Sequence, residues 1–517
     1  MEQTNKQTNI FCFLLILYSL FSNYSLGYPP NIYALAGNFL LLFLAFRLSK
    51  FLFFTVLLFH SLICSVYIPE AIFYGSPSVG IIASLFETNM QESWEYLQSL
   101  PLYSYVISLL FLLFSVGFAV FALKVKFLPM KKTTVSTLIF LIVIAVLYKP
   151  WSNYHKGRDF RLTDTRVSLI GFYWVNYHLI KDYLRQKSEM IAVKNQQSTW
   201  EISSVSPKYR NYVVIIGESM RADYLSMYGY PIETTPFLAK TKGLIIDGYI
   251  SAAPNTQSSL ARTLYLYKEN DTQFQNNIIT LAKQAGFKTY WLSNQGFSGE
   301  FDSVAARVGV GSDKSHFTQL SSDSININDK TLLQIFRTEL QKSDEMPRLF
   351  VLHLMGSHPV FCRRIDMSPF IWFKNNEMSC YLETLRQTDA LIKNVVDLVQ
   401  AEGNDYSLIY FSDHGLSHRD KESKKMTLQV GNEHKENYQV PFIRISGDDS
   451  ERRIIKTQRS AFNFIYGFAH WLGIQEKTLS NGYQFFSEIP DDVKVFNWYQ
   501  DVNFEQLLSD PAVVESR

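Results

Sequence analysis

The run YVVIIGES at residues 212–219 decides the fold of the carboxy-terminal part of the chain, because an unbroken apolar stretch ends in a glycine, a carboxylate and a hydroxyl. Strands that are buried on both faces of a parallel sheet have such continuous apolar runs. Five more runs of this kind follow, at residues 243–250, 289–294, 348–357, 407–412 and 440–446. Amphipathic pieces of helical length separate them, among them 277–286 and 382–402. This alternation predicts an α/β domain with a mainly parallel sheet.

Polar side chains follow three of these runs, at the point where each predicted strand ends. Glu218 follows the first run, His358 follows the fourth, and Asp413 with His414 follows the fifth. Taken singly, each has an ordinary structural explanation, since Glu218 fits the first turn of a helix and a lone histidine is more often structural than a ligand. Ligands of open α/β sheets bind beyond the carboxyl ends of the strands, so we expect these side chains to gather at one edge. Carboxylates and neutral imidazoles are zinc ligands, and this set leaves a position for a reacting oxygen.

The segment SAAPNTQSSLARTLY at residues 251–265 contains hydroxyls that can supply that reacting oxygen. It follows the second run, and its proline and asparagine predict a turn ahead of a helix, which places Thr256 near a helix amino terminus. Free backbone N–H groups at such a terminus favour an anionic phosphate. The alternative is that Thr256 is an ordinary N-cap, and Ser258, Ser259 and Thr263 are competing nucleophiles.

The first 150 residues have a different composition, because they contain only 13 of the 96 charged side chains of the chain. A helix needs roughly 20 mostly apolar residues to cross a bilayer. Five stretches have this character, at about residues 10–26, 31–48, 51–68, 102–123 and 133–149. Further hydrophobic stretches follow the first one, so we interpret it as an uncleaved span rather than a secretory signal. The net charge of +2 gives no reason to expect a nucleic acid as the main partner.

Lysines and arginines set the predicted orientation of these spans, because positively charged loops stay on the cytoplasmic side. The loops at residues 27–30 and 69–99 contain neither lysine nor arginine. The positive residues before position 133 lie ahead of the first span or in the two other loops: Lys6, Arg47, Lys50, Lys124, Lys126, Lys131 and Lys132. We therefore expect five spans, a cytoplasmic amino terminus and a carboxy-terminal domain on the outer side.

An aromatic stretch at residues 166–186 bears on this topology, because a sixth span there would return the carboxy-terminal domain to the cytoplasm. Its uncharged core, from Val167 to Ile180, is about 14 residues long, which is short for a span. Its aromatic residues, such as Trp174, suit the headgroup layer of a membrane. We therefore expect a helix that lies at the membrane surface.

Several motifs together resemble the inner-membrane phosphoethanolamine transferases, which belong to the alkaline phosphatase and sulfatase superfamily. These motifs are GESMRADYLSMYGYPIETTPFL (217–238), a threonine 38 residues after Glu218, HLMGSHP (353–359), YLETLRQTDALI (381–392) and SDHG (412–415). The resemblance covers about residues 10 to 490 and rests on the order and spacing of the motifs. It implies an α-helical membrane domain of five transmembrane helices and an alkaline-phosphatase-like α/β domain in the periplasm. The expected boundaries are 1–150 for the spans, 151–206 for the interfacial helix and linker, 207–490 for the catalytic domain and 491–517 for a carboxy-terminal tail.

The resemblance also implies a zinc-dependent nucleophile. Carried over by position, the expected ligands of one zinc ion are Glu218, Asp413, His414 and Thr256. Thr256 is also the expected nucleophile, which becomes phosphorylated during the reaction. Zinc would lower the pKa of the threonine hydroxyl and offset the negative charge of the transition state.

Two further histidines, His358 and His434, match family residues that contact the phosphoethanolamine group or a second zinc ion. One or two zinc ions are therefore expected. His434 lies in the stretch VGNEHKENYQVP, just before the sixth run. His418, four residues beyond His414, is an alternative to His434, and we interpret His353 within the fourth run as structural.

The implied reaction is transfer of phosphoethanolamine from phosphatidylethanolamine to a lipopolysaccharide acceptor, lipid A or core heptose, through a threonine-phosphoethanolamine intermediate. Donor, acceptor and membrane lipids are the expected partners. Periplasmic glucan is an alternative acceptor, and phosphoglycerol transfer is an alternative reaction on the same fold. A sulfatase is disfavoured because residues 251–263 contain no C/S-x-P-x-R pattern, and an inactive scaffold is disfavoured because the expected zinc ligands are present.

The chain also departs from the family pattern. Many lipid A-modifying members have disulfides near the nucleophile and after the third run, but neither segment contains a cysteine here. The segment SNQGFSGEF (293–301) also lacks a lysine that is common in the family, and its SNQ resembles the branches that act on core heptose or periplasmic glucan. The two cysteines of the outer domain, Cys362 and Cys380, could pair in an oxidising compartment.

Overall fold

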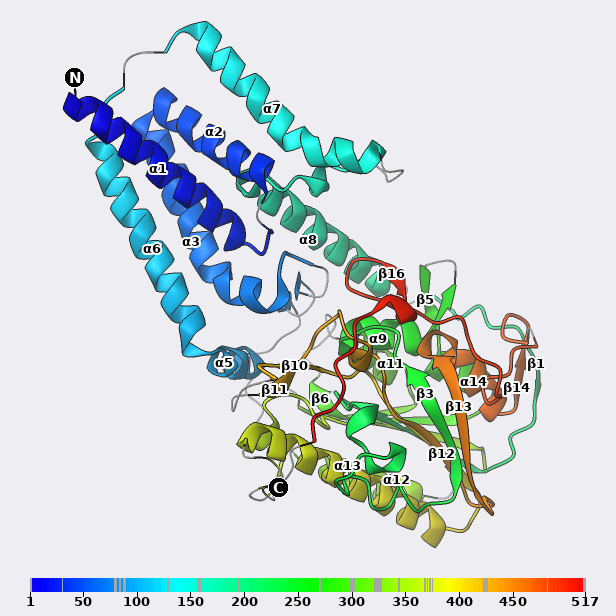
Figure 1. Cartoon of the computed structure of the whole chain (residues 1–517). Coiled ribbons are helices and arrows are strands. Elements are labelled where there is room, and N and C mark those ends of the chain that lie inside the picture. The colour runs from blue at the N-terminus through cyan, green and yellow to red at the C-terminus, as the bar shows by residue number, and fades with distance from the viewer. Residues whose placement is uncertain are drawn as a thin grey trace. The chain divides into compact units, whose positions relative to one another are not determined.

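A computed structural model describes the chain apart from a set of short segments. The residues outside the description are 1, 30, 79–80, 83–84, 87–89, 128–129, 156–159, 193–195, 269–270, 297–302, 320–327, 343–344, 367–368, 370, 372, 374, 422–425, 481 and 515–517. The chain divides into two compact units (Figure 1). One unit comprises residues 1–86 and 93–186, and the other comprises residues 87–92 and 187–517.

The amino-terminal part of the chain is helical (Figure 1). Its helices are α1 (Glu2–Tyr24), α2 (Ile32–Leu48), α3 (Lys50–Tyr74), α5 (Met90–Ser99), α6 (Leu102–Leu123), α7 (Lys132–His155) and α8 (Ser168–Ala192). Each of the five predicted spans is helical over nearly all of its length. By length and hydropathy α3, α6 and α7 can cross a membrane, and α2 is apolar but shorter, with 17 residues. The aromatic stretch that we expected at the membrane surface lies within α8.

Aromatic rings and paired polar groups hold the amino-terminal helices together. The buried Phe11 ring of α1 lies 4.6 Å from the ring of Phe46 in α2 and 5.5 Å from the ring of Phe118 in α6. Polar groups inside a membrane need internal partners, and Asn38 Nδ2 of α2 donates to Ser168 Oγ of α8 over 2.9 Å. Contacts of both kinds therefore join helices that are distant in sequence.

The carboxy-terminal unit is built on an eight-stranded sheet in the order β13-β3-β12-β9-β2-β8-β6-β7. The strands are β2 (Asn211–Gly217), β3 (Gly243–Ile250), β6 (Lys288–Gly296), β7 (Lys314–Gln319), β8 (Arg348–His353), β9 (Tyr406–Ser412), β12 (Phe442–Ser446) and β13 (Arg452–Ser460). All six predicted runs form strands, and the fourth ends earlier than its apolar run, at His353. Only β12 is antiparallel to its neighbours β9 and β3 among the pairs described. The expected mainly parallel sheet is therefore confirmed.

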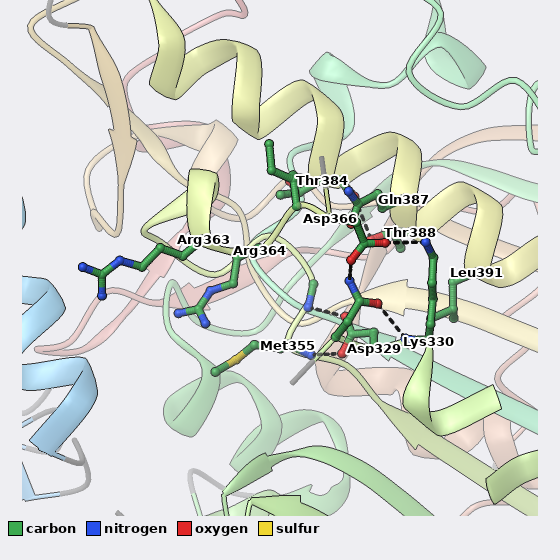
Figure 2. A pocket seen from close by; sticks show the side chains of 13 residues that line it. Asp329, Lys330, Met355, Arg363, Arg364, Asp366, Thr384, Gln387, Thr388 and Leu391 are labelled. Atoms are coloured by element: carbon green, nitrogen blue, oxygen red, sulfur yellow. Dashed lines mark hydrogen bonds and ion pairs between the residues drawn. The ribbon is translucent and has the colours of Figure 1, made fainter. Parts of the chain in front are cut away.

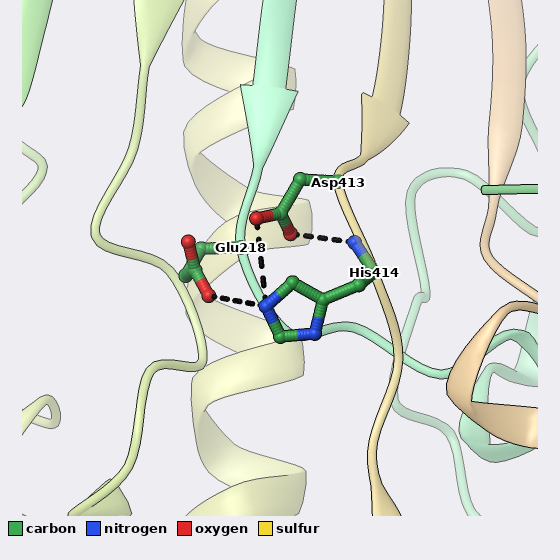
Figure 3. A group of neighbouring side chains, drawn as sticks. All are labelled: Glu218, Asp413 and His414. Carbon is green, nitrogen blue, oxygen red and sulfur yellow. Dashed lines mark hydrogen bonds and ion pairs between the residues drawn. The ribbon is translucent and has the colours of Figure 1, made fainter. Parts of the chain in front are cut away.

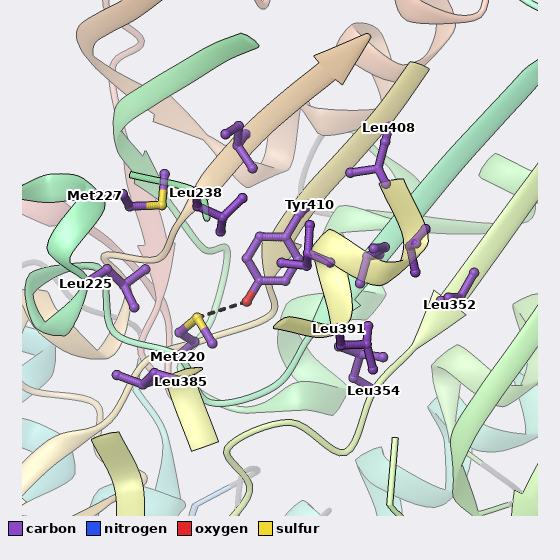
Figure 4. Close-up of a cluster of buried hydrophobic side chains, with 14 of the residues drawn as sticks. Met220, Leu225, Met227, Leu238, Leu352, Leu354, Leu385, Leu391, Leu408 and Tyr410 are labelled. Atoms are coloured by element: carbon purple, nitrogen blue, oxygen red, sulfur yellow. Dashed lines mark hydrogen bonds between the residues drawn. The ribbon is translucent and has the colours of Figure 1, made fainter. Parts of the chain in front are cut away.

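Helices cover both faces of this sheet, which explains why its central strands are apolar throughout. Val213 and Ile215 of β2 pack into a core that contains α12 (Thr331–Leu340) and α13 (Asn376–Ala401), part of which is drawn in Figure 4. Val214 and Ile216 point into a second core on the other face. The helices of that second core are α9 (Thr256–Thr263), α10 (Ile278–Gln284), α11 (Val304–Val310) and α14 (Phe464–Trp471). The predicted helical connectors coincide with α10 and α13.

Four two-stranded sheets complete the description of this unit. They pair β1 (Ile202–Val205) with β14 (Ile474–Glu476), β4 (Tyr265–Lys268) with β5 (Asp271–Asn277), β10 (Ser417–Arg419) with β11 (Thr427–Gln429), and β15 (Lys494–Phe496) with β16 (Asp501–Asn503). The pair β10–β11 lies in the long connection between β9 and β12, at the edge where β9 ends. This edge also carries the ends of β2 and β8, because these strands run parallel to β9 and to each other.

Candidate metal centre and nucleophile

Two adjacent parallel strands bring three potential metal ligands together (Figure 3). Glu218 directly follows β2, and Asp413 and His414 directly follow β9, which pairs with β2 so that Gly217 lies opposite Ser412. His414 Nε2 is 3.2 Å from Glu218 Oε1 and 3.6 Å from Asp413 Oδ2. The three ligand atoms lie within 4.8 Å of one another, and all three side chains are buried. The strand ends therefore meet as the sequence predicts.

Backbone contacts fix the geometry of this trio, which consists of Glu218, Asp413 and His414. Asp413 N donates to the Gly217 carbonyl over 3.1 Å, and Ser219 N donates back to Asp413 Oδ1 over 3.1 Å. His414 Nδ1 lies 2.7 Å from the Gly415 carbonyl, which only accepts hydrogen bonds, so this nitrogen carries a proton. The other ring nitrogen, Nε2, therefore faces the two carboxylates and is the atom available for a metal.

Burial and the neighbouring charges shift the pKa values of all three side chains. Burial opposes ionisation of Glu218, but the hydrogen bond and charge of His414 hold the pKa of Glu218 well below its usual range. Burial and the charge of Glu218 raise the pKa of Asp413 to about 8. Burial lowers the pKa of His414, but Asp413 and Glu218 outweigh it and raise that pKa to about 9. Two buried carboxylates beside one imidazole thus form a site that favours a cation.

The surroundings of Asp413 Oδ2 show whether a metal ion fits this site. It is buried and accepts no hydrogen bond from any residue that the structure describes. A buried carboxylate oxygen without a partner is costly unless another group satisfies it. Two carboxylates and one imidazole nitrogen also match the oxygen and nitrogen ligands of zinc. The residues present therefore fit a zinc ion.

Thr256 lies beside this trio, at the first residue of α9. Its Oγ1 donates to Glu218 Oε2 over 3.0 Å and lies 3.4 Å from His414 Nε2. The N-cap of α9 is Asn255, whose side chain accepts from Ser258 N, so Thr256 is not the ordinary N-cap that the sequence left open. The helix start thus directs the threonine hydroxyl toward the potential metal ligands.

Two of the competing hydroxyls are engaged elsewhere. Ser259 Oγ donates to the Asp413 carbonyl over 2.6 Å, and Thr263 Oγ1 donates to the Ser259 carbonyl over 2.9 Å. Both are buried within α9. The structure brings Thr256 to the trio, whereas the Ser259 hydroxyl ties α9 to the end of β9 and the Thr263 hydroxyl bonds within α9.

Sequence reasoning did not assign a role to Gln295, although the side chain belongs to the site. Its Nε2 donates to Glu218 Oε2 over 3.1 Å and to the Leu354 carbonyl over 2.9 Å. Gln295 lies near the end of β6, so its position at a strand end was the available signal. The rest of that motif, from residue 297 onward, lies outside the described residues.

The four other histidines considered make different contacts. His358 is close enough for its charge to lower the pKa of Glu218, and its Nδ1 lies 2.6 Å from the Pro359 carbonyl. His434 Nδ1 is 3.2 Å from Ser417 Oγ. His418 is bonded elsewhere, through Nε2 to the Tyr224 hydroxyl and through Nδ1 to Asp510. His353 is buried in β8, with Nδ1 3.2 Å from Ser293 Oγ.

The loop that carries Gly356 and His358 is held from behind by Asp329. Asp329 accepts from Met355 N, from Gly356 N and from Asn294 Nδ2, over 2.9, 2.8 and 2.7 Å. The same carboxylate lines a polar cavity of about 150 Å³ between this loop and α13 (Figure 2). A disulfide between Cys362 and Cys380 joins the segment after the loop to α13, so the two cysteines pair. The loop is therefore anchored by the Asp329 carboxylate, and the segment after it by the disulfide.

Comparison with known proteins defines first the class of the domain. The sulfatase family model matches residues 210–474, which include the trio, Thr256 and the other candidate residues. The crystal structure of the zinc complex of the carboxy-terminal periplasmic domain of EptC from Escherichia coli shares this fold, with a TM-score of 0.51 and 20% identity. It covers 60% of this chain and 96% of that domain. The carboxy-terminal unit is thus a sulfatase-type α/β domain.

Relatives that match beyond this domain define the family. The phosphoethanolamine transferase OpgE of Escherichia coli is 35% identical over 476 residues, which cover 91% of this chain and 90% of the relative. A putative phosphoethanolamine transferase of Haemophilus influenzae is 35% identical over 72% of this chain and 75% of its own length. This chain belongs to the phosphoethanolamine transferase family, and its carboxy-terminal unit belongs to the sulfatase family.

A full-length solved structure extends the match to the membrane domain. The integral membrane protein lipooligosaccharide phosphoethanolamine transferase A of Neisseria meningitidis has a TM-score of 0.61 and 18% identity, and the match covers 91% of this chain and 97% of that chain. The expected fold class, a helical membrane domain followed by an alkaline-phosphatase-like domain, is therefore confirmed. The Neisseria protein is an integral membrane protein and the domain of the Escherichia coli protein is periplasmic, which is the arrangement expected from the sequence of this chain.

Proposed function

We propose that this protein transfers phosphoethanolamine from phosphatidylethanolamine to a lipopolysaccharide acceptor, with Thr256 as the nucleophile. The observation that carries the proposal is the position of Thr256 Oγ1, which lies 3.0 Å from Glu218 Oε2 and 3.4 Å from His414 Nε2. A nucleophilic hydroxyl needs a neighbouring group that takes its proton and a site that stabilises charge. Family membership supports the same chemistry.

The metal is proposed to be one zinc ion, with Glu218, Asp413 and His414 as protein ligands beside Thr256. When bound, zinc supplies a Lewis acid that stabilises the negative charge on the phosphoryl oxygens and on the threonine oxygen. Asp413 Oδ2 supports this assignment, because it is buried and accepts no hydrogen bond from the described residues. The zinc complex of the related periplasmic domain supports the choice of metal. His358 and His434 are proposed to contact the phosphoethanolamine group, or a second zinc ion.

The transfer takes place in two balanced steps. In the first, Thr256 Oγ1 attacks phosphorus, an oxygen–phosphorus bond forms, and the bond from phosphorus to the diacylglycerol oxygen breaks. The threonine proton passes to the diacylglycerol oxygen as that oxygen leaves, and Glu218 Oε2, which accepts the hydrogen bond from Oγ1, orients the hydroxyl for attack. In the second step an acceptor hydroxyl or phosphate oxygen attacks phosphorus, and the bond from phosphorus to Thr256 Oγ1 breaks. The proton that Thr256 Oγ1 takes up comes from the acceptor hydroxyl, or from solvent where the acceptor is a phosphate oxygen that carries none. Backbone N–H groups at the start of α9 favour the charged phosphoryl group.

Thr256 is tested by mass spectrometry of peptides from the full-length protein purified in detergent. We expect a phosphoethanolamine adduct on Thr256 in the natural protein and none in Thr256→Ala. Thr263→Ala, on the same helix, should retain the adduct because its hydroxyl bonds only within the helix. An unmodified Thr256 in the natural protein, with an intact adduct in a related transferase treated in parallel, would contradict the proposal.

The donor and acceptor need separate assays. Release of diacylglycerol from phosphatidylethanolamine is expected, and release from phosphatidylglycerol would favour phosphoglycerol transfer instead. Periplasmic glucan is the second candidate acceptor, favoured by the SNQ segment, whose Gln295 contacts Glu218. Masses of lipopolysaccharide and glucan from cells with and without the gene identify the acceptor. A gain of one phosphoethanolamine unit on glucan alone would replace lipopolysaccharide as the proposed acceptor.

A further inference from the structure

A buried ionic network joins the carboxy-terminal segment, residues 508–513, to the loops that carry the potential metal ligands. Its centre is Asp510, whose side chain is largely buried against the fully buried Arg221. Arg221 Nη1 donates to Asp510 Oδ2 over 3.2 Å, and Nη2 donates to the Asp510 carbonyl over 2.6 Å. A buried guanidinium is stable only when its charge and donors are satisfied, so Arg221 depends on this segment.

Arg221 links the two ligand-bearing loops. It lies three residues after Glu218, and its Nη1 also donates to the carbonyl of Leu416, two residues after His414, over 3.2 Å. Its Nη2 and Nε donate to the carboxylate of Asp223 over 2.7 and 2.9 Å. The guanidinium therefore fixes the loop after β2 against the loop after β9, and Asp510 is one of two carboxylates that hold it in place.

Asp510 contacts the loop after β9 directly as well. It accepts from His418 N over 2.7 Å, from His418 Nδ1 over 2.8 Å and from Lys421 Nζ over 2.9 Å. Asp510 N donates to Glu436 Oε2 over 2.7 Å. The carboxylate thus faces three donors of positive or polar character, Arg221, His418 and Lys421, and its own backbone faces a second carboxylate.

The same segment borders His434. Leu508 N donates to the Glu433 carbonyl over 2.9 Å, and Lys435 N donates to the Leu508 carbonyl over 2.8 Å. Further along, Ala512 N donates to Asp223 Oδ2 over 2.7 Å. Residues 508–513 therefore run past three functional loops in turn, those of His434, of His414 and of Glu218.

We propose that Asp510 is a positioning residue for the metal centre, which acts through Arg221 and His418 to hold Glu218 at metal-binding distance from Asp413 and His414. This inference rests on the proposed function, because it concerns the same zinc site. It assigns the carboxy-terminal segment to the machinery of the site rather than to a dispensable tail. Partners in the outer shell of a metal site commonly change metal affinity by about 10- to 100-fold.

The chain contains a matched control for a purely structural role. Asp491 also pairs with a buried arginine, Arg459, and it accepts from Ser460 N and Asn463 Nδ2 over 2.8 and 3.0 Å. These partners lie on β13 and directly after it, not on the ligand-bearing loops. Asp491→Asn and Asp510→Asn therefore break similar buried ion pairs, but only the second bears on the metal centre.

The test measures zinc affinity of the full-length protein in detergent, by competition with a chelator, together with the thermal unfolding midpoint and with kcat and KM separately. Asp510→Asn should lower zinc affinity by about 10- to 100-fold and lower kcat, whereas Asp491→Asn should lower the unfolding midpoint and leave zinc affinity unchanged. Asp510→Glu should restore part of the affinity. His418→Gln is a milder variant that should lower affinity in the same direction.

The outcomes separate the inference from the proposed function. A natural protein that binds no zinc would overturn the proposed metal site itself. Zinc binding in the natural protein, with equal affinity in Asp510→Asn or, should that variant not fold, in Asp510→Glu and His418→Gln, would overturn only the role of Asp510. Equal losses of affinity in Asp491→Asn and Asp510→Asn would mean that both act through global stability, which also contradicts the inference.

Discussion

Some residues of this site, such as Asp413, could be predicted from the sequence, whereas Gln295 could not. The order of Glu218, Asp413 and His414 in the sequence was enough to predict their meeting, because parallel neighbouring strands end at the same edge. The role of Gln295 was not predictable, because an amide at a strand end has many possible partners. Its two bonds, to Glu218 and to the Leu354 carbonyl, depend on the spacing between β6 and β8 in space.

His418 illustrates the opposite outcome. Its spacing from His414 made it a candidate ligand, but its two ring nitrogens bond to Tyr224 and Asp510. Asp510 is 92 residues further along the chain, and a contact over that distance leaves no local pattern in the sequence. Spacing alone therefore cannot distinguish a ligand from a residue that supports the ligands.

His353 predicts a pH dependence of stability. Burial lowers the pKa of His353 to about 4, from a usual value of 6.5, so the unfolded chain binds a proton between these values that the folded chain does not. The contribution of this residue to the free energy of unfolding is therefore fully present above pH 6.5. It is lost as the pH falls toward 4, and the total loss is about 3 kcal/mol. Denaturant unfolding of the full-length protein at pH 7, 6, 5 and 4.5 measures it.

The difference between natural protein and variant isolates this contribution from that of the metal ligands. His353→Asn should show a shallower loss of unfolding free energy between pH 6.5 and 4.5. His316→Asn should leave the loss unchanged, because the His316 side chain is exposed in the folded protein as well. An equally steep loss in His353→Asn and in the natural protein would contradict the prediction.

At the scale of elements, burial decides which strands the sequence reveals. The six predicted strands include the sheet centre, where both faces are covered, so β2, β8 and β9 are buried at every position. The edge strands β7 and β13 were not predicted, because their sequences KSHFTQ and RRIIKTQRS are mostly polar. Edge strands have one solvated side and lose the continuous apolar signal.

The loop after β8 predicts a specific glycine requirement. Gly356 has φ 47°, and a Cβ there would lie 3.0 Å from Glu218 N and 3.1 Å from the Glu218 carbonyl oxygen. Gly356→Ala should therefore cost at least about 1 kcal/mol of backbone strain and also displace Glu218, with a loss of transfer activity of at least about tenfold. Activity and unfolding midpoint measured together distinguish the two effects.

Gly286 is the matched control for this prediction. It has φ 86° at the end of α10, and a Cβ there would meet nothing within 4 Å. Gly286→Ala should lower the unfolding midpoint through the same backbone strain and retain transfer activity. Full activity in Gly356→Ala would show that the close approach to Glu218 is not required.

At the scale of the whole molecule, the two compact units predict how the protein responds to metal removal. The potential zinc ligands all belong to the unit of residues 87–92 and 187–517. Zinc at 1,000 times its dissociation constant stabilises a folded unit by about 4 kcal/mol. Chelation should therefore lower the unfolding transition of the carboxy-terminal unit and leave that of the helical unit in place.

Differential scanning calorimetry in detergent measures both transitions. Returning zinc should restore the transition of the carboxy-terminal unit, and returning magnesium should not, because magnesium prefers octahedral oxygen ligands and keeps its waters. A chelator that shifts both transitions by the same amount would show that the two units unfold as one. A chelator without any effect would contradict a structural contribution of the metal.

The reversed direction of β12 has a consequence for how this protein can change over evolutionary time. Because β12 is antiparallel to β9, it begins at the edge where β9 ends, and the connection between the two strands starts and finishes at that edge. A crossover helix would have constrained the length of this connection, whereas here its length can vary outside β10, β11 and the residues that form or support the metal centre. The connection is therefore a place where related chains can diversify while the sheet and its ligand-bearing strand ends are preserved.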